Sequence, residues 1–195
     1  MATPERHKTP EQNKDCDALL DALALAMVKK PKASLGELAK AVGISRGTLY
    51  NFCRTRDELL DRLFSYGIRI ISEDIEAAKM DTTPPLEALR NMTLESFKHW
   101  EITLFMTRYW KPEHECPPPD LDWDAKMDAL FLRGQREGVF RIDIPAAALS
   151  EIWVGLFVGL VDAEYRDRIA RSGIADLMER AFLQGMAPVK EKVFA

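Results

Sequence analysis

The chain has 195 residues, of which 47% are hydrophobic, and its formal net charge is −4 at pH 7. This apolar content is sufficient for a sizeable core in one large or two small domains, whereas the net negative charge argues against a protein coated in nucleic acid. The three cysteines lie far apart and show no paired spacing, so we expect a reducing cytoplasm and neither a disulfide framework nor a zinc site.

Targeting and membrane segments are not expected. The first eighteen residues are mostly polar and do not resemble a signal peptide. The longest apolar run, residues 152–161, has half of the ~20 residues that are needed to span a bilayer. We therefore expect a globular protein that does not enter a membrane.

Charge is unevenly distributed along the chain. Residues 1–56 contain ten Lys or Arg and six Asp or Glu, whereas residues 57–195 contain seventeen and twenty-five. A basic N-terminal part beside an acidic remainder suits a protein that contacts phosphates at one end only.

The chain begins with a polar segment, residues 1–14, which contains two prolines and is predicted to be a mobile arm. Such arms sometimes reach into a minor groove, but the acidic residues of this one favour a disordered leader. A first helix is predicted over residues 15–29, because Leu19, Leu20 and Leu23 recur at helical spacing before Pro31 ends the pattern.

The most informative segment, residues 34–56, has the pattern of a helix-turn-helix. Two short helices that cross steeply need a small side chain where their backbones approach and a residue tolerant of positive φ where the first helix ends, and Ala39 and Gly43 supply them. Ser34 and Ser45 stand where N-caps belong, and residues 55–58 match a capping box. The alternative is an ordinary surface helical hairpin, but the agreement of caps, small residues and apolar positions favours DNA binding.

Helical spacing continues to the end of the chain. It predicts helices over residues 56–80, 86–104, 123–134, 145–172 and 174–185, with Gly138 as a left-handed cap and a proline-rich loop over residues 111–120. No segment alternates as a strand does. We therefore predict an all-α fold of about nine helices, with an N-terminal three-helix head and a larger C-terminal helical body.

Two neighbouring runs in the head resemble the DNA-binding region of the TetR family of bacterial transcriptional regulators. They are Leu38-Ala39-x-x-Val42-Gly43-Ile44-Ser45-Arg46-Gly47-Thr48-Leu49-Tyr50-Asn51-Phe52 and Arg54-Thr55-Arg56-Asp57-Glu58-Leu59-Leu60. The similarity covers about residues 18–63. The chain departs from the family's pattern at Cys53, which stands where an aromatic residue is usual, and in the short link over residues 29–33, which lacks the usual glycine.

The resemblance implies a homodimer whose two heads enter successive major grooves of a palindromic operator, while each body binds a small-molecule effector. It divides the chain into a mobile N-terminal arm (1–14), a helix-turn-helix DNA-binding domain (15–62) and a ligand-binding and dimerisation domain (63–195). In the family, the positions along the DNA face correspond to Ser34, Ser45, Arg46, Gly47, Thr48, Tyr50, Asn51 and Arg56.

The chemistry of these residues fits contact with DNA. Tyr50 and the capping hydroxyls can donate to phosphates, Arg56 stands at a helix N-terminus that favours an anion, and Arg46 or Asn51 can read base edges. For Tyr50 the alternative is a core aromatic residue with an exposed hydroxyl. We interpret Cys53 as a small core residue rather than a redox sensor.

Residues 151–161 are apolar on all sides for about three turns, so a helix there must be buried on more than one face. One face can serve the core of the subunit and another a second subunit, and Gly155 and Gly159 allow a neighbouring helix to approach closely. With the last helix, this segment resembles the four-helix dimer interface of the family. The alternative is a central core helix of a monomer, but a single head has too few contacts for specific operator binding.

The body is rich in large apolar side chains, most of which are explained by core packing. A pocket lined by aromatic residues is the expected ligand site, so we expect a hydrophobic or aromatic effector. The candidate ligand-binding residues are Phe97, Trp100, Phe105, Tyr109, Trp110, Phe131, Trp153 and Phe157. Residues 95–99 lack the Glu-x-x-His spacing of a di-iron bundle, and we expect no metal or cofactor.

Together these observations predict a ligand-responsive transcriptional repressor. Effector binding in the body is expected to shift the long helix over residues 56–80, to change the separation of the two heads and so to lower operator affinity. The alternative is a helical protein-interaction module without sequence-specific DNA binding. An enzyme is disfavoured, because the sequence contains no Ser/His/Asp grouping, metal-ligand spacing or phosphate loop.

Overall fold

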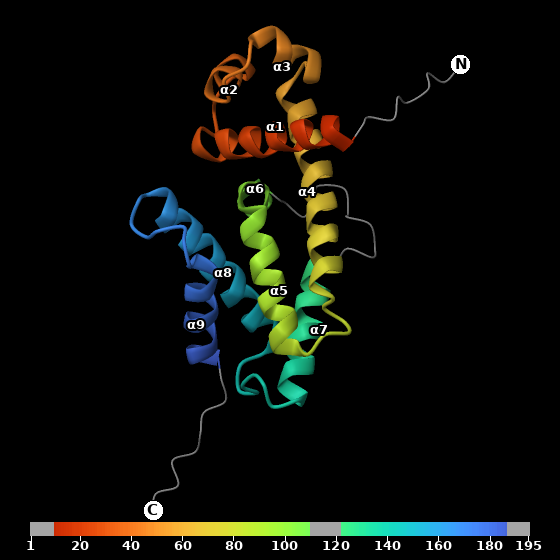
Figure 1. Ribbon diagram of the computed structural model, residues 1–195, viewed down its shortest axis with the longest axis vertical. Helices are drawn as coiled ribbons and strands as arrows, with labels where there is room; N and C mark the ends of the chain where they lie inside the picture. The colour runs from red at the N-terminus through yellow and green to blue at the C-terminus, as the bar shows by residue number, and fades with distance from the viewer. Residues whose placement is uncertain (1–9, 110–121, 187–195) are drawn as a thin grey trace, which may run out of the picture. The chain divides into compact units, whose positions relative to one another are not determined.

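The computed structural model describes residues 10–109 and 122–186, and every regular element in these ranges is an α-helix (Figure 1). The described residues form two compact units. Unit 1 contains residues 10–69 and 101–109, and unit 2 contains residues 70–100 and 122–186. The predicted all-α fold class is confirmed, and nine helices lie within the described part of the chain.

Unit 1 consists of α1, α2, α3, the first part of α4 and nearly all of α6. Their bounds are Pro10–Lys29 (α1), Leu35–Ala41 (α2), Arg46–Phe52 (α3), Arg56–Ala78 (α4) and Trp100–Tyr109 (α6). Helix α1 begins at Pro10, whereas the sequence predicted a helix from residue 15. Proline suits a first helical turn, because its missing N–H would have no partner there. The rest of the predicted arm lies outside the described residues.

The predicted caps of α2 and α3 are present. Ser34 and Glu37 form a capping box, in which the Ser34 hydroxyl accepts from the Glu37 N–H at 3.3 Å and the Ser34 N–H donates to Glu37 Oε2 at 2.8 Å. Ser45 caps α3 by accepting from the Thr48 N–H at 3.0 Å. Gly43, in the turn between the two helices, has a φ of 76°, as its position predicted. Local sequence therefore defines both short helices.

Leucines from α2, α3 and α4 form the core that holds these short helices in place. The fully buried members are Leu38, Leu49, Leu59 and Leu63. Each contributes about 1.5–3 kcal/mol relative to an exposed side chain. Two tyrosine hydroxyls join further helices to this core: Tyr66 donates to Asp21 of α1 at 2.9 Å, and Tyr109 of α6 donates to the backbone oxygen of Met27 at 2.9 Å.

Unit 2 is a helical bundle with an aromatic core (Figure 1). It contains the end of α4 together with α5 (Pro85–Lys98), α7 (Trp123–Arg136), α8 (Ala146–Tyr165) and α9 (Ile174–Met186). The Phe131 ring lies 5.2 Å from that of Phe140 and 5.6 Å from that of Phe182. A Cβ on Gly134 would overlap the Phe140 ring, and Gly138 has a φ of 72°, as predicted for a left-handed cap.

Besides the start of α1, two predicted helix boundaries were wrong. The segment 86–104, predicted as one helix, is divided into α5 and α6 at His99, whose φ of −111° and ψ of 35° leave the helical region. Helix α8 ends at Tyr165 instead of near residue 172, and Asp167 follows with a φ of 56°. Neither boundary carries a glycine or proline, so local composition gave no signal for it. The predicted loop over residues 111–120 lies outside the described ranges.

One described helix, α8, is long and apolar enough to cross a membrane by length and composition. A helix that is covered on two sides in a water-soluble assembly has the same composition. One side of α8 is buried within unit 2, through Leu149, Trp153, Phe157 and Val161. The hydropathy of α8 alone therefore does not distinguish a membrane span from a helix with two packed faces.

Candidate nucleic-acid interface

Helix α3 divides its side chains into an inner row and an outer row. Leu49 is fully buried, and Cys53, directly after the helix, is 1% exposed. The outer row consists of the exposed residues Arg46, Gly47, Thr48, Tyr50 and Asn51. Tyr50 is 39% exposed, which does not fit a core aromatic residue. Burial raises the pKa of the Cys53 thiol, as expected for a small core residue.

Arg46 and Tyr50 interact across one turn of the outer row. Arg46 Nη2 donates to the Tyr50 hydroxyl at 3.2 Å, and its guanidinium carbon lies 5.2 Å from the centroid of the Tyr50 ring. This hydrogen bond raises the pKa of Arg46. Because a guanidinium has five N–H donors, the bond to Tyr50 orients Arg46 and leaves donors for a base edge or a phosphate.

The two capping serines differ in the donors that they offer. The Ser34 hydroxyl donates to Glu37 Oε2 at 2.8 Å, so a phosphate contact from Ser34 requires exchange of that bond. The Ser45 hydroxyl lies 2.7 Å from Thr48 Oγ1, where either oxygen can be the donor. Both serines are exposed.

Arg56 joins the first turn of α4 to the connection between α1 and α2. It is half-buried, and its Nη2 donates to the backbone oxygen of Pro31 at 2.7 Å. Thr55 caps α4 by accepting from the Glu58 N–H at 3.1 Å, whereas the Glu58 carboxylate accepts from the Arg54 N–H at 2.8 Å. Thr55 thus caps α4 as predicted, but the return bond of the capping box comes from the Arg54 N–H instead of the Thr55 N–H. Arg56 has a structural partner, Pro31, that its sequence position did not indicate.

The predicted ligand-binding residues are divided between the two units. In unit 1, Phe105 and Tyr109 stack with ring centroids 4.7 Å apart. Unit 2 holds Phe97, Trp100, Phe131, Trp153 and Phe157, all of them buried, and Trp110 lies outside the described residues. Phe157 joins two of this second group, because its ring lies 4.9 Å from Phe97 and 6.1 Å from Trp153. These rings form the core of unit 2.

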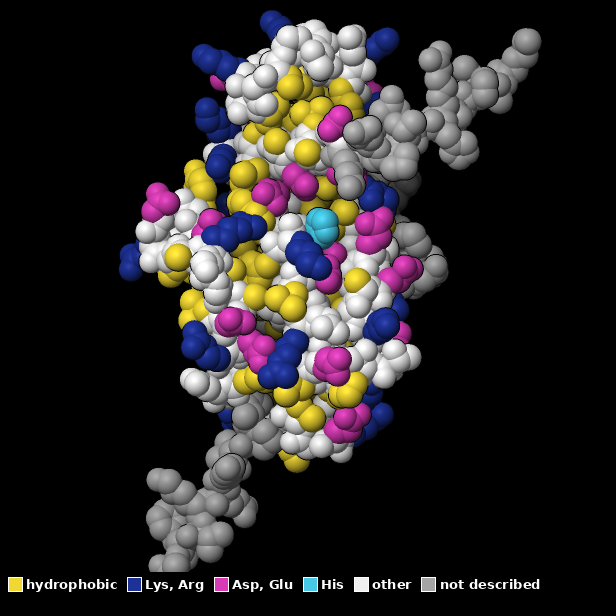
Figure 2. Space-filling view, viewed as in Figure 1, with side chains coloured by type: hydrophobic (Ala, Val, Ile, Leu, Met, Phe, Trp, Pro, Cys, Tyr) yellow, Lys and Arg dark blue, Asp and Glu magenta, His cyan; other side chains and the backbone are white. Residues whose placement is uncertain are grey.

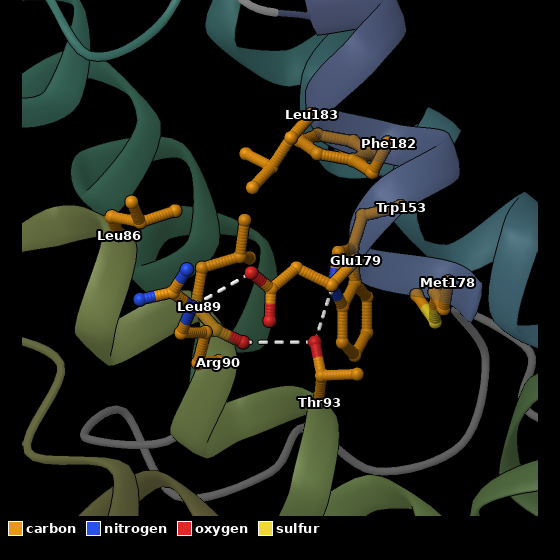
Figure 3. A pocket seen from close by; sticks show the side chains of 9 residues that line it. All are labelled: Leu86, Leu89, Arg90, Thr93, Trp153, Met178, Glu179, Phe182 and Leu183. Carbon is orange, nitrogen blue, oxygen red and sulfur yellow. Dashed lines mark hydrogen bonds and ion pairs between the residues drawn. The ribbon is translucent and has the colours of Figure 1, made fainter. Parts of the chain in front are cut away.

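A small pocket opens beside Trp153, among α5, α8 and α9 (Figure 3). It is lined by Leu86, Leu89, Arg90, Thr93, Trp153, Met178, Glu179, Phe182 and Leu183. Trp153 Nε1 donates to Thr93 Oγ1 at 3.2 Å, and Arg90 pairs with Glu179 at 2.7 Å. The cavity volume is about 10 Å³, room for about one water molecule and far below the ~300–1,000 Å³ of typical small-molecule sites. The sequence indicated only Trp153 of this set, because the others follow ordinary amphipathic patterns.

A buried carboxyl group in unit 2 was also missed. Asp74 on α4 is 3% exposed, and its Oδ1 lies 4.0 Å from Nε2 of His99, the residue that separates α5 from α6. Burial, followed by the charges of Glu95 and Glu73, raises the pKa of Asp74 to about 7. In the sequence Asp74 is one polar residue beside an apolar stripe, and His99 and Glu95, which lie near it in the fold, are about 20 residues or more further along the chain.

Beside the buried stripe of Trp153 and Phe157, α8 carries a second apolar stripe that is incompletely covered. It carries Ile152, Leu156 and Leu160, which are half-buried, and the exposed residues Gly155 and Gly159. A Cβ on either glycine would meet nothing within 4 Å. This face fits the expectation of a second packing surface on α8.

Comparison with known proteins identifies the family, although no family model matches the chain. The HTH-type transcriptional regulator NfxB of Pseudomonas aeruginosa is 41% identical over 173 residues, which are 87% of this chain and 92% of NfxB. The HTH-type transcriptional repressor LfrR of Mycolicibacterium smegmatis is 32% identical over 174 residues, 87% of this chain and 88% of LfrR. The crystal structure of LfrR, a TetR-like regulator, superposes with a TM-score of 0.69 over 91% of this chain and 98% of that one, at 23% identity when aligned by structure.

The chain belongs to the TetR family. The MbdR regulator from Azoarcus sp. CIB has the same fold, with a TM-score of 0.66 over 87% of this chain and 97% of that one, at 18% identity. TetR regulators bind operator DNA and small-molecule effectors and form dimers. This chain is therefore a DNA-binding transcriptional regulator, and the alternative of a protein-interaction module is set aside. Its TetR relatives are regulators of transcription, not enzymes.

Proposed function

We propose that this chain is a cytoplasmic repressor that binds a palindromic operator as a homodimer and leaves it when a hydrophobic or aromatic effector binds. We assign it no catalytic activity. The observation that carries the proposal is the outer row of α3, which is exposed while Leu49 is buried beneath it. A helix divided in this way can lie in a major groove with its polar row toward the bases.

The residues of the interface divide by chemistry. We assign base reading to Arg46 and Asn51, because guanidinium and amide groups form paired hydrogen bonds with guanine and adenine edges. Hydroxyl groups suit phosphate contacts, which position the protein without reading sequence. The residues assigned to these contacts are Ser34, Ser45, Thr48 and Tyr50. Gly47 adds no side chain between them, and Arg56 supports the interface from the start of α4.

The uncovered face of α8 supports the proposed homodimer. Gly155 and Gly159 let a second α8 approach closely, and the half-buried side chains beside them supply apolar surface. Helix α9 adds Leu177 and Ala181, both exposed. Two copies of α8 and α9 would form a four-helix interface that brings two heads to one operator, with recognition helices about 34–36 Å apart.

The aromatic core of unit 2 supports an aromatic effector. LfrR has been crystallised in complex with proflavine, an aromatic compound. In this chain Phe97, Trp153 and Phe157 are packed against one another, so an effector that enters among them must separate the rings. Helix α4 contributes residues 56–69 to unit 1 and 70–78 to unit 2. We therefore propose α4 as the element that carries the change to the head.

Selection of binding sites from a random-sequence DNA library by the full chain tests the DNA-binding part. We expect enrichment of a palindrome whose half-sites are centred about 10 base pairs, or a multiple of that, apart. Arg46→Ala should reduce discrimination by about 1–3 kcal/mol for each base pair that Arg46 reads. The control Arg136→Ala, an exposed arginine of α7, should not change discrimination. Failure of the chain to enrich any sequence would refute the proposal.

Titration of proflavine into the complex with the selected duplex tests the effector part. Coupling of typical size would lower the affinity for DNA about 5–150-fold. The fluorescence of the buried Trp153 reports binding, and Trp153→Phe serves as the control that removes this signal while keeping an aromatic ring. If neither proflavine nor other aromatic compounds change DNA affinity, an aromatic effector is excluded.

A further inference from the structure

The connection between α1 and α2 carries positive charge that the interface described above does not use. From Lys29 to Arg56 the sequence contains seven Lys or Arg and one acidic residue, Glu37. Three of the seven, Lys29, Lys30 and Lys32, lie in residues 29–33, which we call the connector, and all three are exposed. Figure 2 shows dark-blue side chains that project around the end of unit 1 that carries α2 and α3.

The connector is an ordered turn. The Lys30 N–H donates to Ala26 at 2.9 Å, and the Ala33 N–H donates to the Lys30 oxygen at 3.0 Å. Ala33 is buried, which fixes the end of the turn against the unit. Within residues 10–109 and 122–186, no ion pair of 4.0 Å or less engages Lys30 or Lys32. The turn therefore presents two exposed ammonium groups from a defined backbone, of which that of Lys30 also helps to lower the pKa of Glu37.

Two arginines place the connector beside the outer row of α3. Arg56 Nη2 holds the Pro31 oxygen at 2.7 Å. The Arg46 side chain passes over the first turn of α2, because a Cβ on Gly36 would lie 3.7 Å from Arg46 Nε. The connector leads directly into that turn through Ser34, the N-cap of α2.

We infer that Lys30 and Lys32 bind the phosphodiester backbone of DNA beside the half-site that α3 reads, and that Arg56 positions the connector through the Pro31 oxygen. This inference rests on the proposed DNA binding and adds a second, sequence-independent contact to it. The partner is duplex DNA because the connector continues a basic surface that contains the outer row of α3, and neutralised phosphates release their condensed counterions. Arg56 is a positioning residue, since its side chain donates to the protein backbone at Pro31.

The salt dependence of binding to the selected palindromic duplex tests the role of the lysines. Two lysines in each of two heads make four contacts, so the slope of log affinity against log salt should become less negative by about 3 to 4 in Lys30→Gln/Lys32→Gln. The ranking of DNA sequences should not change. The matched control is Lys79→Gln/Lys126→Gln in unit 2, which should keep the wild-type slope. A wild-type slope in the connector variant, or an equal change in the control, overturns the inference.

Arg56→Gln, alone and combined with the connector variant, tests the positioning role. If Arg56 acts through the connector, the substitution Arg56→Gln should make the salt slope less steep in the wild-type background. It should have little further effect on the slope in Lys30→Gln/Lys32→Gln. Equal losses in both backgrounds would mean that Arg56 contacts phosphate itself and would overturn its positioning role. Arg56→Lys, which keeps one charged donor, should restore part of the slope, and thermal unfolding checks that each variant is folded. If the wild-type chain selects no palindrome, the proposed function fails; selection with an unaltered variant slope rejects the lysine role alone.

Discussion

At Gly43 one backbone angle fixes the turn between α2 and α3. Its φ of 76° is in the left-handed region, and a Cβ there would meet nothing within 4 Å, so any strain on substitution comes from the backbone alone. We expect Gly43→Ala to lower the free energy of unfolding by about 1–2 kcal/mol, measured by urea denaturation. Gly36→Ala in α2 is the control: its Cβ makes ordinary contact with Arg46, and alanine favours the helix. If Gly43→Ala is as stable as Gly36→Ala, the turn does not require this angle.

Asp74 gives the stability of the protein a definite dependence on pH. Its pKa is raised from 3.8 to about 7 by burial, with further raising by Glu95 and Glu73 and lowering by Lys98, while His99 lies 4.0 Å away. Because the folded protein holds this proton more tightly than the unfolded chain does, stability is fully present below about pH 4 and is lost as the pH rises through 7. Asp74→Asn should remove this loss and stabilise the protein at pH 8 by on the order of 2–4 kcal/mol, measured by denaturation from pH 5 to 8.

An acid of opposite behaviour provides the control for Asp74. The hydrogen bond from Arg141 lowers the pKa of the exposed Asp143, so its contribution is present above the unfolded pKa and is lost as the pH falls through the folded value. Asp143→Asn should therefore lose stability at neutral pH and little in acid. If Asp74→Asn and wild type keep the same difference in stability from pH 5 to 8, the Asp74 carboxyl is not protonated in the folded protein.

At the residue scale the sequence predicted the features that depend on local geometry, namely helix caps and the turn glycine. Ser34, Ser45 and Gly43 have partners or angles that are set within four residues, and their roles were predicted from spacing alone. The bond from Arg56 to Pro31 spans 25 residues of sequence, and the buried Asp74 lies 4.0 Å from His99, which is equally distant in sequence. Contacts of this kind depend on how helices pack, and no short pattern records them.

For elements, α8 offers the clearest test, because one of its faces is buried within unit 2 and we propose that another meets a second chain. Gly159→Leu adds a large side chain where the chain itself leaves open space, so the variant should fold but should not pair with a second α8. We expect sedimentation to change from dimer to monomer and operator affinity to fall at least tenfold, because one head alone makes too few contacts.

A matched change on another helix makes this test specific. Ala129→Leu adds a similar side chain at an exposed position of α7 and should leave both the dimer and operator binding unchanged. Circular dichroism checks that both variants keep their helix content. A Gly159→Leu protein that still sediments as a dimer would place the interface elsewhere.

Helix existence was predicted better than helix ends. The apolar stripes of α4, α7 and α9 predicted the right elements, because the 3.6-residue period of an apolar stripe does not depend on which helices pack beside it. The break at His99 and the end of α8 at Tyr165 carry neither glycine nor proline. Helix α8 ends in a local turn, in which Asp167 has a φ of 56° and its N–H donates to the Glu164 oxygen at 2.9 Å, so a residue other than glycine takes the left-handed position.

In the whole molecule, α6 shows why division into domains is the hardest feature to predict. Residues 101–109 belong to the same compact unit as the helix-turn-helix, although residues 70–100, which belong to the other unit, separate them in sequence from Arg69. The boundary between residues 62 and 63 separates the part to which we assign DNA binding from the part to which we assign effector binding and dimerisation, and it stays a prediction. Helical periodicity indicates which face of α6 is buried but not which helices cover it.

The dependence of operator affinity on salt reflects both the contacts of each head and the pairing of two chains. If a dimer neutralises about eight phosphates, log affinity should fall against log salt with a slope near −7, measured by fluorescence anisotropy on the selected duplex. A single head holds half of these contacts, so the Gly159→Leu monomer should show a slope about half as steep as well as a weaker affinity. The ratio of the two slopes tests the exposed row of α3 and the open face of α8 together, because the number of phosphate contacts doubles only when two chains pair. A salt-independent affinity, or equal slopes for monomer and dimer, would contradict the assigned interface.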